Sequence, residues 1–486
     1  MELLFYKQKA KAYWIRDEDQ GTNFFHSIVA SKRMSNTIRV LYNHDELLGY
    51  SIPEGAAEAL IIEVSDVEIK DAIWGQGNNK SPGPNRYNSY CFTNTFMLHS
   101  FNVTTVVLVP NVPNPSMVKE FSPISCYSVI YKIATRILVN RLSIVFPCMI
   151  SMNQSAFVKG RRIIDNTLLA QELVRGYNRK KVYPCALKID LQKAFDSLNW
   201  EFVGIVLYAL GLPEKFIGWV WACITNPSFS IMFNGSLVGY FKGAQGVRHG
   251  DPLSPYIFIL AMNVLSSLLN MAAMKGVFNF HPKCKKIGLT HLCFVDDLLI
   301  FYKGSLDSVI GVQAVLDTFY SMSGLKLNAS KCEMYYAGIS VEQCAAIKEI
   351  TGFNLTSLSL RYLGVPLVTR KLTVKDCHSL IDKIRAKLSL WANKHLSFSR
   401  RLQLIQAVLF SMESFWYMQL ILPKEIINTI EQLCSRFFWK GSDLPVKGAR
   451  ASWKKICLMK SEGGLGIQAV GEWNKACIVP NQEIIG

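Results

Sequence analysis

Three aspartates stand where short apolar segments end, and their types and spacing could support metal-ion chemistry. Asp296 and Asp297 are adjacent between two apolar runs, and Asp190 follows the mostly apolar run 186–189. Two neighbouring carboxylates on an apolar strand repel each other and resist burial, so they need a compensating charge. Divalent cations supply that charge, and carboxylate oxygens are ligands that they prefer. Three acids on two strand ends therefore predict a two-metal site for phosphoryl transfer, with the ions about 3.5–4 Å apart.

The acid pair has a second interpretation. Aspartate suits turn conformations and is common at the tip of a β-hairpin, where water solvates the side chain. On that interpretation Asp296 and Asp297 are surface turn residues with no catalytic role. The rest of the chain decides between the two interpretations.

The elements that must position the acids can be predicted from hydrophobic patterning. The run from Phe294 to Ile300 indicates a β-hairpin with its acids at the turn. Residues 75–345 alternate short β-branched runs with helical stretches, which predicts an α+β domain. The stretch 255–274 is long and apolar enough to cross a membrane, but its polar residues fall on one helical face, which favours an amphipathic core helix. Those polar residues are Asn263, Ser266, Ser267 and Asn270.

A second amphipathic helix is predicted further along the chain. Apolar residues recur at helical spacing from Cys377 to Trp391, while Lys383, Arg385 and Lys387 crowd the same segment. This pattern suits a helix that is apolar inside and basic toward the backbone of a nucleic acid. For any single lysine, an ordinary solvated face fits equally well.

The composition indicates a basic, intracellular protein. Its 486 residues carry a formal net charge of +17, which favours a nucleic-acid partner, although a generic basic surface gives the same excess. The 13 cysteines are scattered and form no C-x-x-C pair, so neither a disulfide framework nor a closed zinc site is predicted. The N-terminus lacks the apolar core of a signal peptide. We expect a nuclear or cytoplasmic protein that is not secreted and has no membrane partner.

Eight short motifs follow one another along the chain. In order they are Lys80-Ser81-Pro82-Gly83-Pro84, Phe121-Ser122-Pro123-Ile124-Ser125, Asn153-Gln154-Ser155-Ala156-Phe157 with Gly160-Arg161, Lys188-Ile189-Asp190-Leu191-Gln192-Lys193-Ala194-Phe195-Asp196, Gly246-Val247-Arg248-His249-Gly250-Asp251-Pro252-Leu253-Ser254-Pro255, Phe294-Val295-Asp296-Asp297, Gly324-Leu325-Lys326-Leu327-Asn328 with Lys331, and Tyr362-Leu363-Gly364-Val365-Pro366-Leu367. Each alone is weak, but chance seldom places eight in one order. Together they resemble the reverse transcriptases of plant non-LTR (LINE-type) retrotransposons.

The resemblance implies a fold, an activity and a set of ligands. The fold would be an α+β right-hand polymerase with fingers, palm and thumb, in which helices flank an antiparallel palm sheet. The activity would be RNA-directed DNA polymerisation, a nucleotidyl transfer that uses two Mg²⁺ ions, with Mn²⁺ able to substitute. The partners would be an RNA template, a DNA primer and deoxynucleoside triphosphates.

The resemblance also implies roles for the acids. Asp190 and Asp296 would hold both ions, and Asp297 would be a supporting ligand or a nearby charge. The carbonyl group of Leu191 would supply a further oxygen ligand.

Four residues are expected to face the incoming nucleotide. Phe195 would lie beneath its sugar and exclude a 2′-hydroxyl group, although a core position is the alternative. His249 and Gly250 belong to the loop 248–255, which is expected to touch the template base and the nucleotide. Lys331 would be a cation near the pyrophosphate, or a surface lysine. The residues expected to contact nucleic acid are Arg161, Lys383, Arg385 and Lys387.

The expected organisation has four parts. Residues 1–70 would form an N-terminal extension, 75–345 the fingers and palm, and 346–430 a thumb-like helical region. Residues 431–486 would begin a C-terminal connection that stops before any zinc-binding module. Because the resembling family places an endonuclease domain further upstream, the chain is expected to be a fragment of a longer polyprotein.

Three departures from the family pattern concern the grip on the nucleotide. Ser122 stands where the family commonly has arginine, and His249 where it commonly has glutamine. The stretch 85–106 is divergent and about twenty residues shorter than the family pattern. A hydroxyl group cannot replace the paired hydrogen bonds of a guanidinium group to phosphate. The alternative function is therefore that of a catalytically decayed remnant, which binds nucleic acid but no longer polymerises. A group II intron maturase-like protein is a third hypothesis, which the block 362–367 and the tail disfavour.

Overall fold

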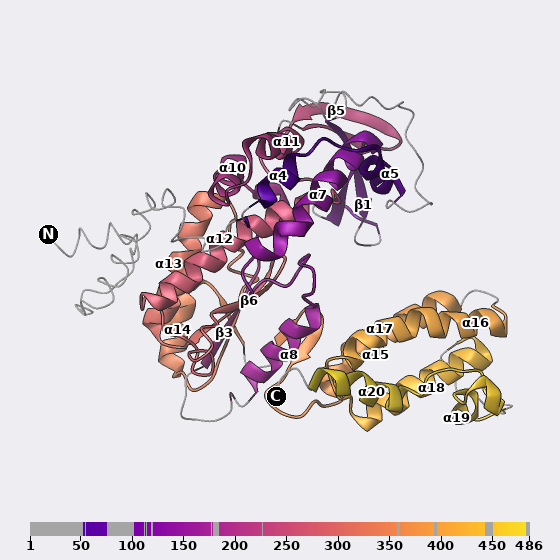
Figure 1. The fold of residues 1–486 in the computed structure, drawn as a ribbon. Coiled ribbons are helices and arrows are strands. Elements are labelled where there is room, and N and C mark those ends of the chain that lie inside the picture. The colour runs from indigo at the N-terminus through magenta and orange to yellow at the C-terminus, as the bar shows by residue number, and fades with distance from the viewer. Residues whose placement is uncertain are drawn as a thin grey trace. The chain divides into compact units, whose positions relative to one another are not determined.

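The computed structural model forms two compact units, 1–163 with 180–356 and 164–179 with 357–486 (Figure 1). The residues that the structure describes are 52–74, 102–225 and 227–482, except for 54, 111, 113, 118–119, 176, 178–183, 357–359, 393–395 and 443–450. Most of the predicted N-terminal extension, the motif at 80–84 and most of the stretch 85–106 lie outside the described residues.

The first unit combines sheets with helices, which confirms the predicted α+β class. Its described strands are β1 (Val103–Pro110), β2 (Phe121–Tyr127), β3 (Pro184–Ile189), β4 (Ser228–Phe233), β5 (Ser236–Lys242), β6 (His291–Phe294), β7 (Asp297–Lys303), β8 (Glu333–Tyr336) and β9 (Asn354–Thr356). Its described helices are α4 (Ala56–Ile61), α5 (Asp66–Trp74), α7 (Val129–Met149), α9 (Ala194–Ser197), α10 (Trp200–Ala209), α11 (Glu214–Ile224), α12 (Ser254–Met274), α13 (Leu306–Ser323) and α14 (Val341–Thr351).

A five-stranded sheet carries the predicted acids. Its strand order is β6-β7-β3-β8-β9, and every pairing is antiparallel except that between β8 and β9. The central strand β3 is buried along almost its whole length, as its nearly continuous apolar sequence requires. Strands β6 and β7 form the predicted hairpin, in which Phe294 pairs with Asp297. Val295 and Asp296 therefore make the turn, and the prediction of acids at this turn is confirmed.

A four-stranded sheet forms the other layer of strands in this unit. Its order is β2-β1-β4-β5, with β1 and β4 parallel and the other pairs antiparallel. Helix α7 begins directly after β2, where the side chain of Ser128 accepts a hydrogen bond from the amide of Tyr131 and so caps the helix. Ser122 lies on β2 opposite Val109.

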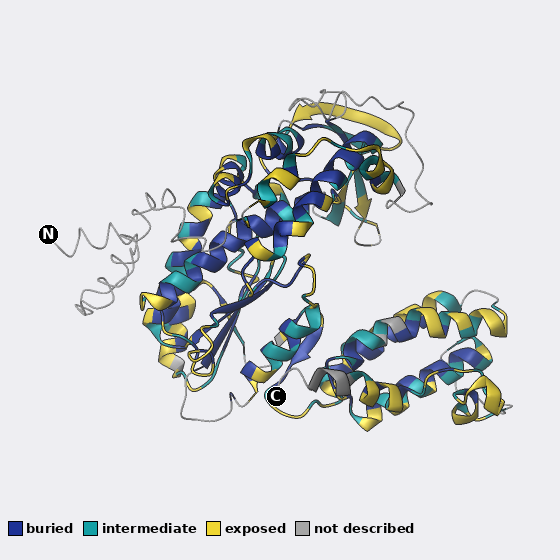
Figure 2. Ribbon diagram, in the orientation of Figure 1, coloured by how far each residue is buried: buried dark blue, intermediate teal, exposed yellow. Residues whose placement is uncertain are grey.

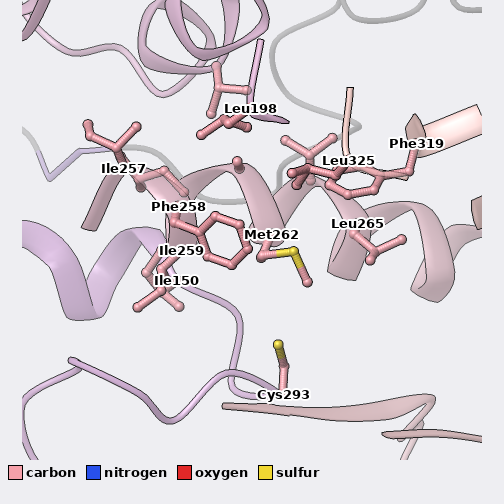
Figure 3. Packing of buried hydrophobic residues seen from close by; sticks show 14 of the residues in the cluster. Ile150, Leu198, Ile257, Phe258, Ile259, Met262, Leu265, Cys293, Phe319 and Leu325 are labelled. Atoms are coloured by element: carbon pink, nitrogen blue, oxygen red, sulfur yellow. The ribbon is translucent and has the colours of Figure 1, made fainter. Parts of the chain in front are cut away.

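Helix α12 is the centre of the core of the first unit. Figure 2 shows it almost entirely buried. In Figure 3 its Phe258 and Met262 lie among apolar side chains from other segments, such as Leu198, Cys293 and Phe319. The helix is long and apolar enough to span a membrane, but 78% of its most apolar window is buried inside the protein. The prediction of a core helix over 255–274 is therefore confirmed.

The predicted amphipathic character of α12 is wrong, because most of its polar residues are also buried. Asn263, Ser266 and Ser267 are all less than one tenth exposed. Asn263 accepts a hydrogen bond from the amide of Ser151 at 2.8 Å and donates one to the carbonyl oxygen of Met149 at 2.9 Å. Buried polar groups are tolerated when such partners satisfy them. The polar stripe thus packs against other chain segments instead of facing solvent.

The second unit is mostly helical. Its described elements are α8 (Ile163–Val174), β10 (Leu360–Tyr362), β11 (Val365–Leu367), η4 (Lys375–Cys377), α15 (His378–Ala392), α16 (Phe398–Leu404), η5 (Ile405–Leu409), α17 (Phe410–Tyr417), α18 (Lys424–Lys440), α19 (Trp453–Ile456), η6 (Lys460–Glu462) and α20 (Val470–Gln482). It has its own apolar core, to which α15 contributes Ile384 and Leu388. The same helix exposes Lys383, Arg385 and Lys387, as its predicted pattern requires.

Candidate active site

The three predicted acids lie at one end of the five-stranded sheet. Strand β3 ends at Ile189, which pairs with Leu298 of β7 in antiparallel register. Asp190 directly follows Ile189 and Asp297 directly precedes Leu298, so both acids adjoin this last pair of the ladder, whose Cα atoms lie about 4.5–5.5 Å apart. Asp296 is the next residue along, in the turn between β6 and β7. Residues separated by about a hundred positions in sequence are thus brought together.

The acids influence one another electrostatically. Burial raises the pKa of Asp296, and the carboxylate of Asp190 raises that pKa further. Burial also raises the pKa of Asp297, with a further increase from Asp296 that Lys188 partly opposes. Like charges that disfavour each other's ionisation must lie within interaction range. A bound cation would relieve this local excess of negative charge.

The carboxylate groups of Asp190, Asp296 and Asp297 offer oxygen donor atoms, which suit a hard divalent cation. Within the described residues, no three His, Cys, Asp or Glu side chains already converge as a metal-binding group. Ions would therefore have to draw the carboxylates of Asp190, Asp296 and Asp297 together by side-chain rotation. Leu191, the other predicted ligand, forms an antiparallel bridge with Leu327, and the role of its carbonyl oxygen stays a prediction.

A cleft of about 350 Å³ lies in the first unit and is lined by α7, the loop before α12, the start of α12, Phe157 and Phe195. It contains three of the four residues predicted to face a nucleotide, namely Phe195, His249 and Gly250. The ring of Phe195 stacks on Phe258, with ring centroids 4.9 Å apart and an interplanar angle of 17°. One face of Phe195 is therefore packed on the core, while the residue still lines the cleft.

His249 is paired with a carboxylate at the edge of this cleft. Its Nε2 atom lies 3.2 Å from Oδ1 of Asp196, and about half of each side chain is exposed. The hydrogen bond that His249 donates to the Asp196 carboxylate raises the pKa of His249, although partial burial works against this increase. The ring of His249 also lies 5.3 Å from that of Phe195. The imidazolium form thus persists to higher pH than for a free histidine.

The residues next to His249 and Gly250 are buried and anchor their loop. Arg248 is 5% exposed and donates hydrogen bonds to Thr104 of β1, to the hydroxyl of Tyr131 in α7 and to Asn102. Asp251 is 2% exposed and accepts a hydrogen bond from the hydroxyl of Tyr131 at 3.1 Å. These bonds tie the loop to the four-stranded sheet. Arg248 therefore acts on the cleft by holding the loop, whereas His249, Gly250 and Asp251 line it.

Lys331 is exposed, in a turn that borders Asp190. This turn starts at Asn328, whose amide donates a hydrogen bond of 2.8 Å to the carbonyl oxygen of Asp190. The role predicted for Lys331 near pyrophosphate stays a prediction.

Of the four residues predicted to contact nucleic acid, one makes hydrogen bonds to the backbone within the protein and three lie on an exposed helix face. Arg161 directs its guanidinium group to the carbonyl oxygens of Ile150, Ser151 and Gln154, so it holds the chain beyond α7. Lys383, Arg385 and Lys387 lie on the exposed face of α15, in the second unit. Contact of these four residues with nucleic acid stays a prediction.

Sequence reasoning missed two polar residues that support the acid-bearing end of the sheet. Gln154 contacts the β6–β7 turn, and Asn263 holds the segment before Gln154. Gln154 belongs to one of the eight motifs, but the sequence offered no sign of its partner, which lies 141 positions away. Asn263 could have been noticed as an amide within an otherwise apolar helix.

Comparison with known proteins agrees with this geometry. The family model described as reverse transcriptase (RNA-dependent DNA polymerase) matches residues 112–367. The chain is 25% identical over 368 residues to the transposon TX1 uncharacterized 149 kDa protein of Xenopus laevis, a match that covers 75% of this chain and 27% of that protein. It is 31% identical over 287 residues to the retrovirus-related Pol polyprotein from type-2 retrotransposable element R2DM of Drosophila melanogaster. That match covers 55% of this chain and 25% of the polyprotein.

The chain thus spans about a quarter of the length of these two curated relatives. Among solved structures, an apo telomerase from Candida tropicalis matches with a TM-score of 0.38 and 12% sequence identity, over 55% of this chain and 54% of that one. At that score the likeness adds nothing to what the family match and the site geometry establish.

Proposed function

This chain belongs to the reverse transcriptase (RNA-dependent DNA polymerase) family, and on that premise we propose that it carries out RNA-directed DNA synthesis for a non-LTR (LINE-type) retroelement. The reaction joins the 3′-oxygen of a DNA primer to the α-phosphorus of a deoxynucleoside triphosphate and releases pyrophosphate. The observation that carries the proposal is the placement of Asp190, Asp296 and Asp297 at one end of a single sheet. A plant source stays a prediction.

We assign two divalent cations, Mg²⁺ or Mn²⁺, to these acids. Asp190 and Asp296 would hold both ions, with Asp297 and the Leu191 carbonyl oxygen in support. Bound there, the ions would lower the pKa of the primer hydroxyl and neutralise the triphosphate and leaving pyrophosphate. The raised pKa values of Asp296 and Asp297 mean that protons compete for the same oxygens as the pH falls.

The cleft lined by Phe195, His249 and Gly250 suits an incoming deoxynucleotide. The ring of Phe195 would meet a ribose 2′-hydroxyl there, which favours deoxyribose. His249 and Gly250 would lie along the nucleotide, and the buried Arg248 keeps their loop in place. The chain's residues thus bind and orient the nucleotide.

We expect the apparent KM for deoxynucleotides to rise as the pH is raised above the ordinary range of histidine, because His249 loses its positive charge when the pH passes its raised pKa. One partly exposed charge near a triphosphate contributes about 0.5–1 kcal/mol, or about two- to fivefold in KM. In the His249→Gln variant this dependence should be absent. Steady-state primer extension at a series of pH values measures it.

The Asp196→Asn variant is the matched control for this pH profile. It removes the carboxylate that raises the pKa of His249, so the rise in KM should begin at lower pH. An identical pH dependence in the unaltered chain and in His249→Gln would show that His249 does not face the nucleotide.

We assign the basic face of α15 to the sugar-phosphate backbone of the template–primer duplex. Replacing Lys383 and Lys387 by alanine should weaken binding and make the plot of log affinity against log salt shallower, by about 0.9 for each lost phosphate contact. Fluorescence anisotropy with an RNA–DNA duplex at several salt concentrations measures the slope. Lys348→Ala, an exposed lysine of α14, is the control. If the slope is unchanged in both the Lys383→Ala and the Lys387→Ala variants, α15 is not part of the surface that binds the duplex.

A catalytically decayed, nucleic-acid-binding remnant is the second candidate function. The departures at Ser122 and His249 favour it, since each removes a side chain that the family commonly uses to grip the nucleotide. Primer extension on an RNA template separates the two candidates. A remnant would bind the primer–template with ordinary salt dependence and add no nucleotide. No observation in the described residues favours the maturase-like alternative.

A further inference from the structure

The turn that presents Asp296 contains a residue in an unfavourable backbone conformation. Val295, between β6 and Asp296, has a φ angle of +58°. This left-handed region is uncommon for residues other than glycine and is a genuine outlier for a β-branched residue such as valine. Conformations of this kind persist only where the surrounding structure holds them. Contacts from the surrounding structure must therefore hold Val295 in this left-handed conformation.

One buried side chain satisfies both backbone polar groups of Val295. The Oε1 atom of Gln154 accepts a hydrogen bond from the amide of Val295 at 3.2 Å, and its Nε2 atom donates one to the carbonyl oxygen of Val295 at 3.4 Å. The same Nε2 atom also lies 3.2 Å from Sγ of Cys293. Gln154 is 1% exposed, so water cannot replace these bonds. A primary amide supplies the required donor and acceptor together.

The backbone around Gln154 is itself fixed on both sides. The segment runs parallel to β6, because the amide of Cys293 donates to the carbonyl oxygen of Asn153 at 2.8 Å and the amide of Ser155 donates to the carbonyl oxygen of Cys293 at 3.2 Å. Arg161 donates to the carbonyl oxygen of Gln154 at 2.6 Å. The amide of Gln154 is thus presented to the turn from a rigid support.

We infer that Gln154 is a positioning residue that holds Val295 in its left-handed conformation and thereby aims the carboxylate of Asp296 toward the ions of the proposed active site. The inference rests on the proposed function only for the identity of the ligand, the divalent cations. The contacts between Gln154 and Val295 do not depend on that function. Asp296 directly follows Val295, so a change in the φ and ψ angles of Val295 redirects the bond from the Asp296 Cα atom to its side chain. If Gln154 only filled space, an apolar side chain of similar volume would serve equally well.

Two substitutions separate positioning from packing. Gln154→Met keeps the volume but removes the hydrogen bonds, and we expect it to weaken the binding of Mn²⁺, without primer or nucleotide, by about tenfold, which is the value of one or two hydrogen bonds. Adding Val295→Gly should return the affinity to within about threefold of the unaltered chain, because glycine adopts the left-handed conformation without strain. Electron paramagnetic resonance of free Mn²⁺ in a titration measures the affinity, and circular dichroism confirms that each variant is folded.

A matched control exists in the second unit. Gln171 makes the same two-way contact with the backbone of Val368, donating to its carbonyl oxygen at 2.6 Å and accepting from its amide at 3.1 Å. Gln171→Met removes an equivalent pair of bonds within the second unit and should leave Mn²⁺ affinity unchanged.

The Asp296→Asn variant distinguishes failure of this inference from failure of the proposed function. If Asp296→Asn weakens Mn²⁺ binding but Gln154→Met does not, Gln154 has no positioning role and the inference is overturned. The same holds if Val295→Gly fails to restore affinity in the Gln154→Met background. If Asp296→Asn itself leaves Mn²⁺ binding unchanged, the proposed metal site is wrong, and the inference is overturned together with it.

Discussion

Replacing Asp296 by asparagine is expected to lower the rate of primer extension by about a thousandfold or more. Asparagine keeps the size of the side chain but removes the charge that a divalent cation needs as its ligand. A correctly held metal ion stabilises the transition state by several kcal/mol, and each 1.36 kcal/mol corresponds to a factor of ten in rate. Single-turnover extension of a labelled primer on an RNA template, at saturating nucleotide, measures the loss.

The matched control for this substitution is Asp307→Asn. Asp307 is an exposed acid in the first turn of α13, in the same unit, and its charge has no role in the proposed chemistry. Its variant should extend primers within about twofold of the unaltered chain. Comparable rates for the Asp296→Asn variant and the unaltered chain would show that the acids at the β6–β7 turn are the solvated hairpin residues of the alternative interpretation.

Replacing Arg248 by methionine is expected to lower the free energy of unfolding of the first unit by about 3–5 kcal/mol. The substitution removes the guanidinium group that bonds to Thr104 and Tyr131, and it leaves the buried carboxyl group of Asp251 without its nearby positive charge. Removing one charged member of a buried hydrogen-bonded network, and so leaving its partners unsatisfied, has a cost of this size. Urea-induced unfolding, followed by tryptophan fluorescence, measures the change.

Arg400→Met serves as the comparison for Arg248→Met. Arg400 is exposed on α16, so its replacement should change stability by less than about 0.5 kcal/mol. A loss below about 1 kcal/mol in the Arg248→Met variant would mean that the loop before α12 does not depend on this buried network. Because the loop carries His249 and Gly250, we also expect Arg248→Met to raise the apparent KM for deoxynucleotides.

The parts of the site that the sequence predicted are those determined by residues that are close together in the chain. The hairpin around Asp296 could be predicted because apolar residues flank an acidic turn, and this pattern is complete within nine residues. The position of Asp190 at the end of a strand was predictable for the same reason. That Asp190 lies near Asp296 and Asp297 was predicted from their shared chemistry and from the resemblance, since no local pattern fixes which strands pair.

The parts that the sequence did not predict depend on distant partners. Asn263 and Ser266 were interpreted as a polar face of α12 because their spacing is helical, but their burial is decided by groups on other segments, such as the amide of Ser151. The clamp of Gln154 on Val295 joins residues 141 positions apart. Arg248 begins the loop 248–255 that the resemblance assigns to the template base and the nucleotide, and only its packing against β1 and α7 shows that it is buried. Such tertiary contacts override local patterning.

The measurement that tests the central claim most directly is the incorporation of one deoxynucleotide by the unaltered chain on an RNA template. With a DNA primer annealed and Mg²⁺ present, we predict addition of the complementary nucleotide only. The addition should require the metal ion and be slow, since Ser122 and His249 replace side chains common in the family. The contrary result is a chain that binds the same primer–template with the expected salt dependence but adds no nucleotide at any concentration of Mg²⁺ or Mn²⁺. That outcome would establish the catalytically decayed remnant in place of the polymerase.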